Sequence, residues 1–460
     1  MNARFIKVWQ DLQSSYYFIP GLMALGSILL AYLTIYLDET YGLEVSELGF
    51  FLSNKADGAR TILATIAGSM MGVAATTFSI TMVAVTSASG QYGPRLIGNF
   101  MRDRGNQITL GTFTSTFIYC LLILRVARTG DVSGTENAVT EFVPNISLLT
   151  AMGLTLLSVG VLIFFIHHVP ETLNVGNITA RVGRRLRKDV EAGYSEESRQ
   201  ENTDNDVDIR HYKPEDAIDV RAKAEGYIQT INKEALLRAA TSHDAVVKIE
   251  YRAGDFATRG DVLLRIWPRE TWEGDIEQYR NTYAMGQDRT AHQNILFLAD
   301  ELVEILARAL SPGVNDPFTA INCINWFHSA LKAFLRGTMP SRYRLDEDGT
   351  LRVISDPIDF ERFCNNICDQ SRAYIVTDRN TTIKMITILT ELTAGADDAG
   401  AREILKLHLQ KLKDAYLQGE RSSPDRLDVE SRFDLAFRMI SDPQLFQSEM
   451  NSPRWVGGRG

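Results

Sequence analysis

Little in this sequence favours nucleic-acid binding or enzymatic catalysis. The 460 residues carry a formal net charge of -9, whereas binding to nucleic-acid phosphates requires a basic face. The motifs of dinucleotide-binding proteins, P-loop enzymes, zinc proteases and serine hydrolases are all missing from it. We therefore expect neither a nucleic-acid partner nor an enzymatic activity.

Cysteine is scarce as well. The four cysteines form no CxxC pair and no cysteine–histidine pattern typical of zinc sites: Cys120, Cys323, Cys364 and Cys368. Cys364 and Cys368 lie one turn apart on a predicted helix, a geometry that is poor for a disulfide and insufficient for a metal. We expect buried or free thiols in a reducing compartment, with no metal site and no cofactor.

Long apolar runs, by contrast, dominate the first 170 residues. About 20 apolar residues suffice to cross a bilayer, and four runs are long enough. They predict membrane-spanning helices over about 17–38, 60–89, 107–126 and 147–168, the first ending at Asp38 and the fourth closed by Pro170. Because no cleavage site of small residues follows the first run, we expect a retained helix rather than a removed signal peptide.

The second run is the most informative, because no charge interrupts it between Arg60 and Arg95. Small and hydroxyl residues share one face of the predicted helix, at steps of three and four: Thr61, Thr65, Ser69, Gly72, Thr76 and Ser79. This stripe either packs against another helix or lines a water-filled path, and both interpretations stay open. The third run carries Thr109, Thr112, Thr114, Ser115 and Thr116, for which close helix packing is favoured.

Two further features of the spans bear on function. No ionisable residue lies at mid-membrane, which argues against a proton relay or an ion-coupled transporter. Lysine and arginine favour cytoplasmic N- and C-termini, with ten on the inner flanks (Arg4, Lys7, Arg95, Arg102, Arg104, Arg181, Arg184, Arg185, Arg187, Lys188) against four outside (Lys55, Arg60, Arg125, Arg128).

The remaining residues predict a cytosolic α+β portion. A basic juxtamembrane helix and an acidic linker occupy 171–216, and a mostly helical domain with a hairpin at 343–354 occupies 269–450, followed by a mobile tail at 451–460. Residues 217–268 read as short strands and resemble the barrel-sandwich fold of biotinyl and lipoyl domains. Lys248 lies inside a predicted strand rather than at a hairpin tip, so we expect a small β-barrel with a structural role.

The segment Ser311 to Ala320, SPGVNDPFTA, separates two amphipathic helices. One interpretation is a tight turn, with Asp316 capping the second helix and Pro317 at its first position. The other is a cation site, formed if the turn folds back so that Asp300, Glu304, Asn315 and Asp316 share an ion. The spacing matches no calcium-loop pattern.

This segment, together with FSITMVAVTSASGQYGPRLIGNFMRDRGNQITLGTF (78–113), resembles a bacterial integral membrane family catalogued as domain of unknown function 2254. The resemblance implies an inner-membrane protein with four N-terminal spans and a large cytosolic portion. It implies no established activity and no site residues.

We therefore expect a four-helix transmembrane domain (1–170) joined to a cytosolic α+β portion with a small β-barrel and a helical bundle. The hypothesis for function is a homo-oligomeric channel for ions, in which the second span lines the path and the cytosolic portion forms a vestibule or gate. The alternative is a non-conducting scaffold or sensor whose cytosolic portion binds a partner or ligand.

Overall fold

The computed structural model describes residues 16–46, 56–93, 103–127, 142–195, 210–268, 270, 272–291, 293–419, 422–452 and 455. The chain divides into two compact units, and the division falls between Asn174 and Val175. We call residues 10–174 the membrane unit and residues 175–460 the C-terminal unit. Lys55 and Arg95, two of the cations that flank the second predicted span, lie outside the described residues, as does most of the predicted tail.

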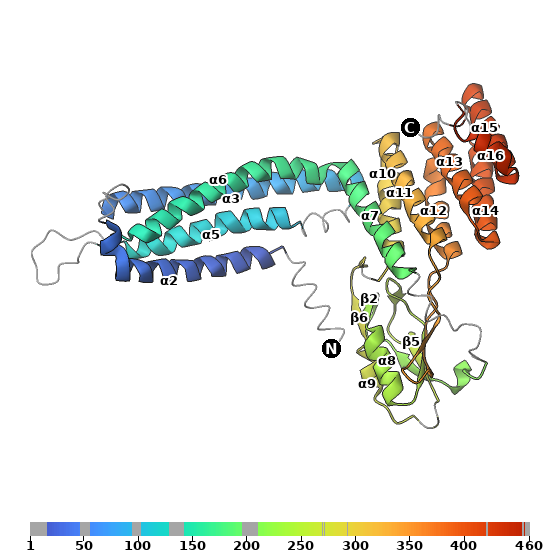
Figure 1. Ribbon diagram of the computed structural model, residues 1–460, viewed down its shortest axis with the longest axis horizontal. Coiled ribbons are helices and arrows are strands. Elements are labelled where there is room, and N and C mark those ends of the chain that lie inside the picture. The colour runs from blue at the N-terminus through green and yellow to red at the C-terminus, as the bar shows by residue number, and fades with distance from the viewer. Residues whose placement is uncertain are drawn as a thin grey trace, which may run out of the picture. The chain divides into compact units, whose positions relative to one another are not determined.

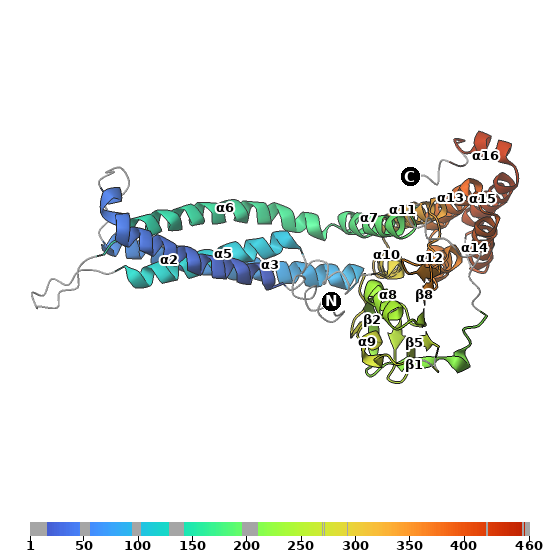
Figure 2. The same ribbon diagram turned by 60° about the horizontal axis from the view of Figure 1, so that its bottom comes forward.

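In the described part of the membrane unit, four long helices lie side by side (Figures 1 and 2). Their bounds are α2 (Phe18–Ser46), α3 (Ala56–Tyr92), α5 (Arg104–Val126) and α6 (Asn145–Leu173). Each is long and apolar enough to cross a membrane, which confirms the four predicted spans. Two predicted ends are wrong: α2 continues beyond Asp38, and Pro170 lies inside the last turn of α6 rather than after it.

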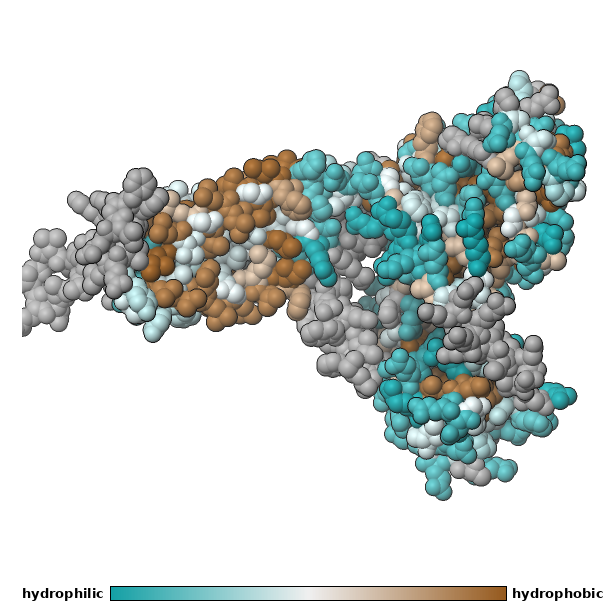
Figure 3. All heavy atoms as spheres, in the orientation of Figure 1, coloured by the Kyte–Doolittle hydropathy of each residue, from teal (hydrophilic) through white to brown (hydrophobic). Residues whose placement is uncertain are grey.

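Apolar side chains cover the surface of these helices (Figure 3). Leu29 of α2 and Leu156 of α6 are 70% and 74% exposed, as expected for residues that face lipid. The helix α5 lies inside the group and packs against α2, α3 and α6. The core around it includes Leu63, Tyr119 and Ile123.

The C-terminal unit begins with the amphipathic helix α7 (Val175–Gly193), which packs against α10 (Ile295–Ala309) and α11 (Pro317–Arg336). Further helices follow, namely α12 (Phe360–Ile375), α13 (Arg379–Gly395), α14 (Ala399–Leu417), α15 (Ser423–Ser441) and α16 (Pro443–Glu449). An aspartate caps the N-terminus of each of α11, α12, α13 and α14 by accepting a hydrogen bond from a backbone N–H. The predicted helical bundle is thus present.

Eight short strands of the same unit form two open sheets, so the prediction of a closed β-barrel over 217–268 is wrong. The five-stranded sheet has the order β1-β5-β3-β8-β7, and the three-stranded sheet has the order β4-β2-β6. The strands are β1 (Ile218–Arg221), β2 (Gly226–Ile231), β3 (Val246–Ile249), β4 (Phe256–Ala257), β5 (Val262–Trp267), β6 (Tyr283–Gly286), β7 (Tyr343–Leu345) and β8 (Leu351–Ile354).

The predicted hairpin of β7 and β8 does not belong to the helical part. Its strand β8 pairs in parallel with β3, while the other strand pairs are antiparallel. At the hairpin, Arg352 donates to Asp346 Oδ2 over 2.6 Å and to Asp244 Oδ1 over 2.7 Å. Strands β7 and β8 therefore complete the five-stranded sheet, although they lie about 80 residues beyond residue 268, where the strand region was predicted to end.

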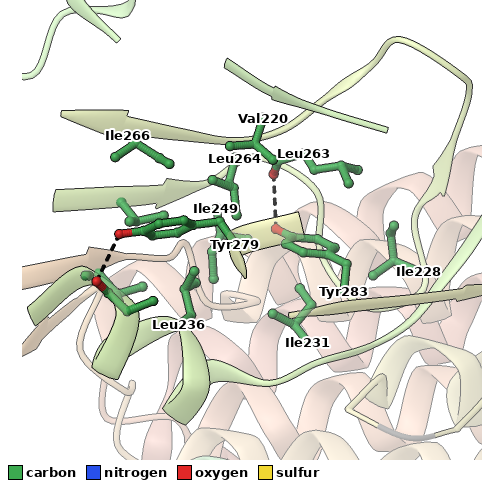
Figure 4. Packing of buried hydrophobic residues seen from close by; sticks show 14 of the residues in the cluster. Val220, Ile228, Ile231, Leu236, Ile249, Leu263, Leu264, Ile266, Tyr279 and Tyr283 are labelled. Carbon is green, nitrogen blue, oxygen red and sulfur yellow. Dashed lines mark hydrogen bonds between the residues drawn. The ribbon is translucent and has the colours of Figure 1, made fainter. Parts of the chain in front are cut away.

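Two short helices, α8 (Lys233–Ser242) and α9 (Ile276–Arg280), join the strands around one apolar core (Figure 4). Two buried tyrosines lie across this core, and their hydroxyls form hydrogen bonds with backbone carbonyls at its edges. Tyr279 donates to the Ala239 carbonyl and Tyr283 to the Leu263 carbonyl, each over 3.0 Å. Since an unpaired buried hydroxyl is costly, these bonds let the large rings lie in the interior.

Candidate functional site

The stripe expected on the second span lies on the outer surface of the membrane unit. Thr61, Thr65, Ser69, Gly72, Thr76 and Ser79 are all exposed there. The opposite face of α3 is buried against the other spans through residues such as Leu63, Met70 and Ala74. Within one chain, the stripe does not pack against the third span.

Two hydroxyls of the stripe are arranged to tolerate an apolar environment. Thr65 donates to the Thr61 carbonyl over 2.7 Å, and Thr61 donates to the Asp57 carbonyl over 2.8 Å. Such bonds to the preceding turn satisfy the hydroxyl without another helix. Gly68 and Gly72 add open surface, because a Cβ at either position would meet nothing within 4 Å.

Hydroxyl residues of α5 are placed differently. Thr109, Thr112 and Thr116 are at most 4% exposed. Thr116 Oγ1 lies 3.1 Å from Ser158 Oγ of α6, a hydrogen bond between two spans. This hydrogen bond confirms helix packing as the role of the buried hydroxyl residues of the third span. The stripe of α3 differs from them because it is exposed.

A polar network fixes one end of the membrane unit. Pro144, at the N-cap of α6, supplies no side-chain cap. Asp38 of α2 supplies it instead and accepts from Ile146 N over 2.7 Å, Ser147 N over 2.9 Å and Ser147 Oγ over 2.6 Å. Next to it, Tyr119 of α5 bonds to Thr34 Oγ1 over 2.8 Å and donates to the Ser147 carbonyl over 3.2 Å.

The four residues of the predicted cation site do not come together. Asp300 pairs with Arg289 over 2.7 Å and accepts from Asn366 over 2.9 Å. Asp316 is occupied as the cap of α11, accepting from Thr319 N over 3.1 Å and Thr319 Oγ1 over 2.6 Å. From Asp300 to the end of α10 is about 14 Å along the helix axis at 1.5 Å per residue.

The other two residues fit the same picture. Glu304 lies one turn beyond Asp300, 3.6 Å from Arg308. Asn315 adopts the left-handed conformation, with φ of 49°, inside the turn. The tight-turn interpretation of the segment is therefore confirmed.

Two cavities, of about 640 and 480 Å³, lie in the C-terminal unit and share the lining residues Arg252, Ala253, Asn294 and Ile358. We call them together the Arg252 groove. Arg252 Nη1 and Asn294 Nδ2 are buried without a hydrogen-bond partner among the described residues. The close approach of the chain at Gly254, with φ of 97°, brings its backbone against the Asn294 amide.

The Arg252 groove carries charges of both signs, with five cationic and six acidic residues in its lining. Burial lowers the pKa of Lys233, and the neighbouring Arg344 and Arg252 lower it further. Burial also lowers the pKa of Arg252, with Arg362 adding to the effect. In both residues burial is the main cause of the lowered pKa, because it disfavours the charged form, and the nearby Asp356, Asp255 and Asp359 oppose the shift at Arg252. Sequence reasoning missed this groove, because its lining comes from residues scattered between 185 and 370.

The comparisons with known proteins agree with a membrane protein. A family model described as "Predicted membrane protein (DUF2254)" matches residues 13–391. Similar proteins include uncharacterized protein Mb1321c of Mycobacterium bovis and uncharacterized protein Rv1290c of Mycobacterium tuberculosis, each 28% identical over 322 residues. The match covers 69% of this chain and 60% of each relative, so the chain covers less than two thirds of their length. No solved structure matches. Because the family model covers well over half of the chain, the protein belongs to the DUF2254 family of predicted membrane proteins.

Proposed function

We propose that this protein forms a symmetric homo-oligomer in the bacterial inner membrane and conducts ions along the stripe of α3. Both termini lie in the cytoplasm, and the C-terminal units form a vestibule or gate. The observation that carries the proposal is the exposure of Thr61, Thr65, Ser69, Gly72, Thr76 and Ser79 on a surface that is otherwise apolar.

The dimensions of the stripe support this function. From Thr61 to Ser79 it extends about 27 Å at 1.5 Å per residue, close to the roughly 30 Å thickness of the hydrocarbon core. A closed ring of subunits places one such stripe per copy at the axis. Four spans with a single exposed stripe do not enclose a path within one chain.

The residues between the hydroxyls support contact between copies. Gly68 and Gly72 form a GxxxG pattern, whose flat surface lets two membrane helices approach closely. We infer that neighbouring subunits touch near Gly72, beside the path. The hydroxyl groups along the rest of the stripe then face the path. Since the stripe carries no charge, ion discrimination along it would be weak, and cations at its ends would have to supply any selectivity.

Ion flux into liposomes tests the proposal. Purified full-length protein should pass ions, and Thr76→Trp or Ser79→Trp should abolish the flux, because a large ring fills the narrow path. Leu156→Trp is the matched control, since Leu156 is 74% exposed on α6, away from the stripe. That variant should conduct as the unmodified protein does.

Assembly must be measured alongside, by the mass of the detergent-solubilised particle. Loss of flux in the stripe variants with unchanged mass supports a conducting stripe. Flux that is indifferent to both stripe variants, or no flux under any condition, contradicts conduction.

A second candidate function is a non-conducting sensor, and the Arg252 groove favours it. Lys233 and Arg252, two partly buried cations of the groove, suit a small ligand with an anionic group, and the apolar residues that line the 480 Å³ cavity suit an attached apolar body. Pyrophosphate should then raise the melting temperature of the protein, and Lys233→Gln should remove the rise. Lys248→Gln, a change at a strand lysine paired with Glu250, is the control. An equal rise in all three proteins contradicts the sensor.

A further inference from the structure

Two thiols and an imidazole meet inside the helical part of the C-terminal unit. Cys364 and Cys368 lie one turn apart on α12, and His408 reaches them from α14. The sulfur atoms are 3.9 Å apart, and one ligand atom from each residue lies within 4.8 Å of the others. We call these three residues the thiol–imidazole cluster; their exposed fractions are 0%, 3% and 2%.

The tautomer of His408 leaves a lone pair for this cluster. His408 Nε2 lies 2.7 Å from Asn365 Oδ1, and an amide oxygen only accepts hydrogen bonds. Nε2 therefore carries the proton, and Nδ1 carries the lone pair. Nδ1 is buried and has no hydrogen-bond partner among the described residues. An imidazole held at one nitrogen by an amide or carbonyl oxygen, with the other nitrogen turned to thiols, has the arrangement of a metal ligand.

The spacing of the sulfurs fits a tetrahedral ion. With zinc–sulfur bonds of about 2.3 Å and a tetrahedral angle, two thiolate sulfurs lie about 3.8 Å apart. The observed 3.9 Å agrees with this value and is far from the roughly 2.05 Å of a disulfide. A void of about 10 Å³ touches Cys368 and His408, with Met385 and Arg372 also in its wall.

The three residues leave a fourth position for water. An Asp369 carboxylate oxygen lies 3.8 Å from His408 Nδ1, and the same carboxylate is 38% exposed. Because it accepts from Arg372 Nη1 over 2.6 Å, it would hold that water rather than bind the ion itself. Two thiolates also balance the double positive charge of the ion. This balance lowers the free-energy cost of burying the ion among apolar neighbours such as Ile375 and Leu389.

We propose that Cys364, Cys368 and His408 bind one Zn²⁺, which fastens α14 to α12. Binding converts the two thiols to thiolates and releases two protons, with no change of oxidation state. The proposal is independent of conduction, because the cluster lies in the C-terminal unit and shares no residue with the stripe of α3.

Metal titration of the full-length protein in detergent tests the site. After removal of bound metal with a chelator, about one equivalent of Zn²⁺ should bind per chain and raise the melting temperature. Co²⁺ should give the near-ultraviolet charge-transfer band of thiolate ligation. Cys364→Ser and His408→Gln should lose both signals. Cys323→Ser, which removes a buried thiol of α11 outside the cluster, should keep them.

Asn365→Ala refines the test, because it keeps all three ligands and removes only the bond that orients His408. Loss of such an orienting contact typically weakens metal binding by about 10- to 100-fold. Absence of the cobalt band in the unmodified reduced protein overturns the proposal, whatever the folding of the variants. So does equal binding by Cys364→Ser and Cys323→Ser, or the formation of a Cys364–Cys368 disulfide in place of metal binding.

Discussion

Asp38 provides a quantitative test of how the spans are held together. Its carboxylate caps α6 from a neighbouring helix and is 4% exposed. Asp38→Ala removes the acceptor of two backbone N–H groups and one hydroxyl. Hydrogen bonds to charged groups contribute about 1.5–3 kcal/mol each. Because the Ser147 hydroxyl can turn to another acceptor, we count the two backbone bonds at the lower end and expect a loss of about 3 kcal/mol.

Asp38→Asn keeps one oxygen for the helix terminus and loses the charge, so it should cost about 1 kcal/mol, as a weakened N-cap does. Glu39→Ala is the control, because Glu39 is the adjacent acid and is exposed. Its effect should stay within about 0.5 kcal/mol, as for most surface substitutions. The assay is reversible unfolding of the full-length protein in mixed micelles with increasing denaturing detergent.

Two results would refute this reasoning. Equal stability of Asp38→Ala and Glu39→Ala would mean that the carboxylate does not hold the N-terminus of α6. An Asp38→Asn variant as unstable as Asp38→Ala would mean that the charge alone, rather than an acceptor at that place, stabilises the helix.

Three further predictions concern the C-terminal unit. Gly183→Ala should destabilise the protein by about 1–3 kcal/mol in thermal unfolding, because the added Cβ would lie 2.2 Å from the Trp326 ring. Gly395→Ala meets open space and should be neutral or stabilising. The pKa of Asp346 is lowered, mainly by a hydrogen bond from Arg352. The ionised carboxylate therefore stabilises the fold fully above its unfolded pKa of about 3.9, and the stabilisation is lost as the pH falls through the lowered folded-state pKa. Melting temperatures of Asp346→Asn and the unmodified protein should therefore differ at pH 7 and converge in acid. Asp316→Ala should cost about 1 kcal/mol through the lost cap of α11, equally with and without calcium; a calcium-dependent difference would instead revive the cation site.

The spans were predictable from sequence because composition alone decides them. A membrane helix needs only a long apolar run, and the four runs are unmistakable. The ends of the helices were less predictable. The helix α2 continues beyond the charged residue Asp38, because the backbone N–H groups at the start of α6 donate hydrogen bonds to its carboxylate.

The sheets were only partly predictable, because strand pairing depends on partners distant in sequence. Local alternation indicated strands over 217–268 and the hairpin at 343–354. It did not indicate that β8 would pair with β3 in parallel, or that β6 would complete the smaller sheet. The closed barrel failed for this reason.

The candidate functional sites were also only partly predictable from the sequence. The α3 stripe follows from helical periodicity, so its residues could be named in advance. The thiol–imidazole cluster could not be, since Cys364 and Cys368 gain His408 only through the packing of α14 on α12. Two cysteines one turn apart were thus insufficient for a metal by themselves, and a third candidate ligand came from 40 residues further on.

Conduction along the α3 stripe requires that neighbouring copies assemble with their stripes facing one another, and disulfide cross-linking in native membranes tests this arrangement most directly. The four native cysteines are buried, so a cysteine introduced at Gly72 is the reactive one. Gly72→Cys should give a covalent dimer under mild oxidation, whereas Leu156→Cys, at an exposed position on α6, should stay monomeric. A Gly72→Cys protein that stays monomeric, or that cross-links no better than Leu156→Cys, would contradict the account.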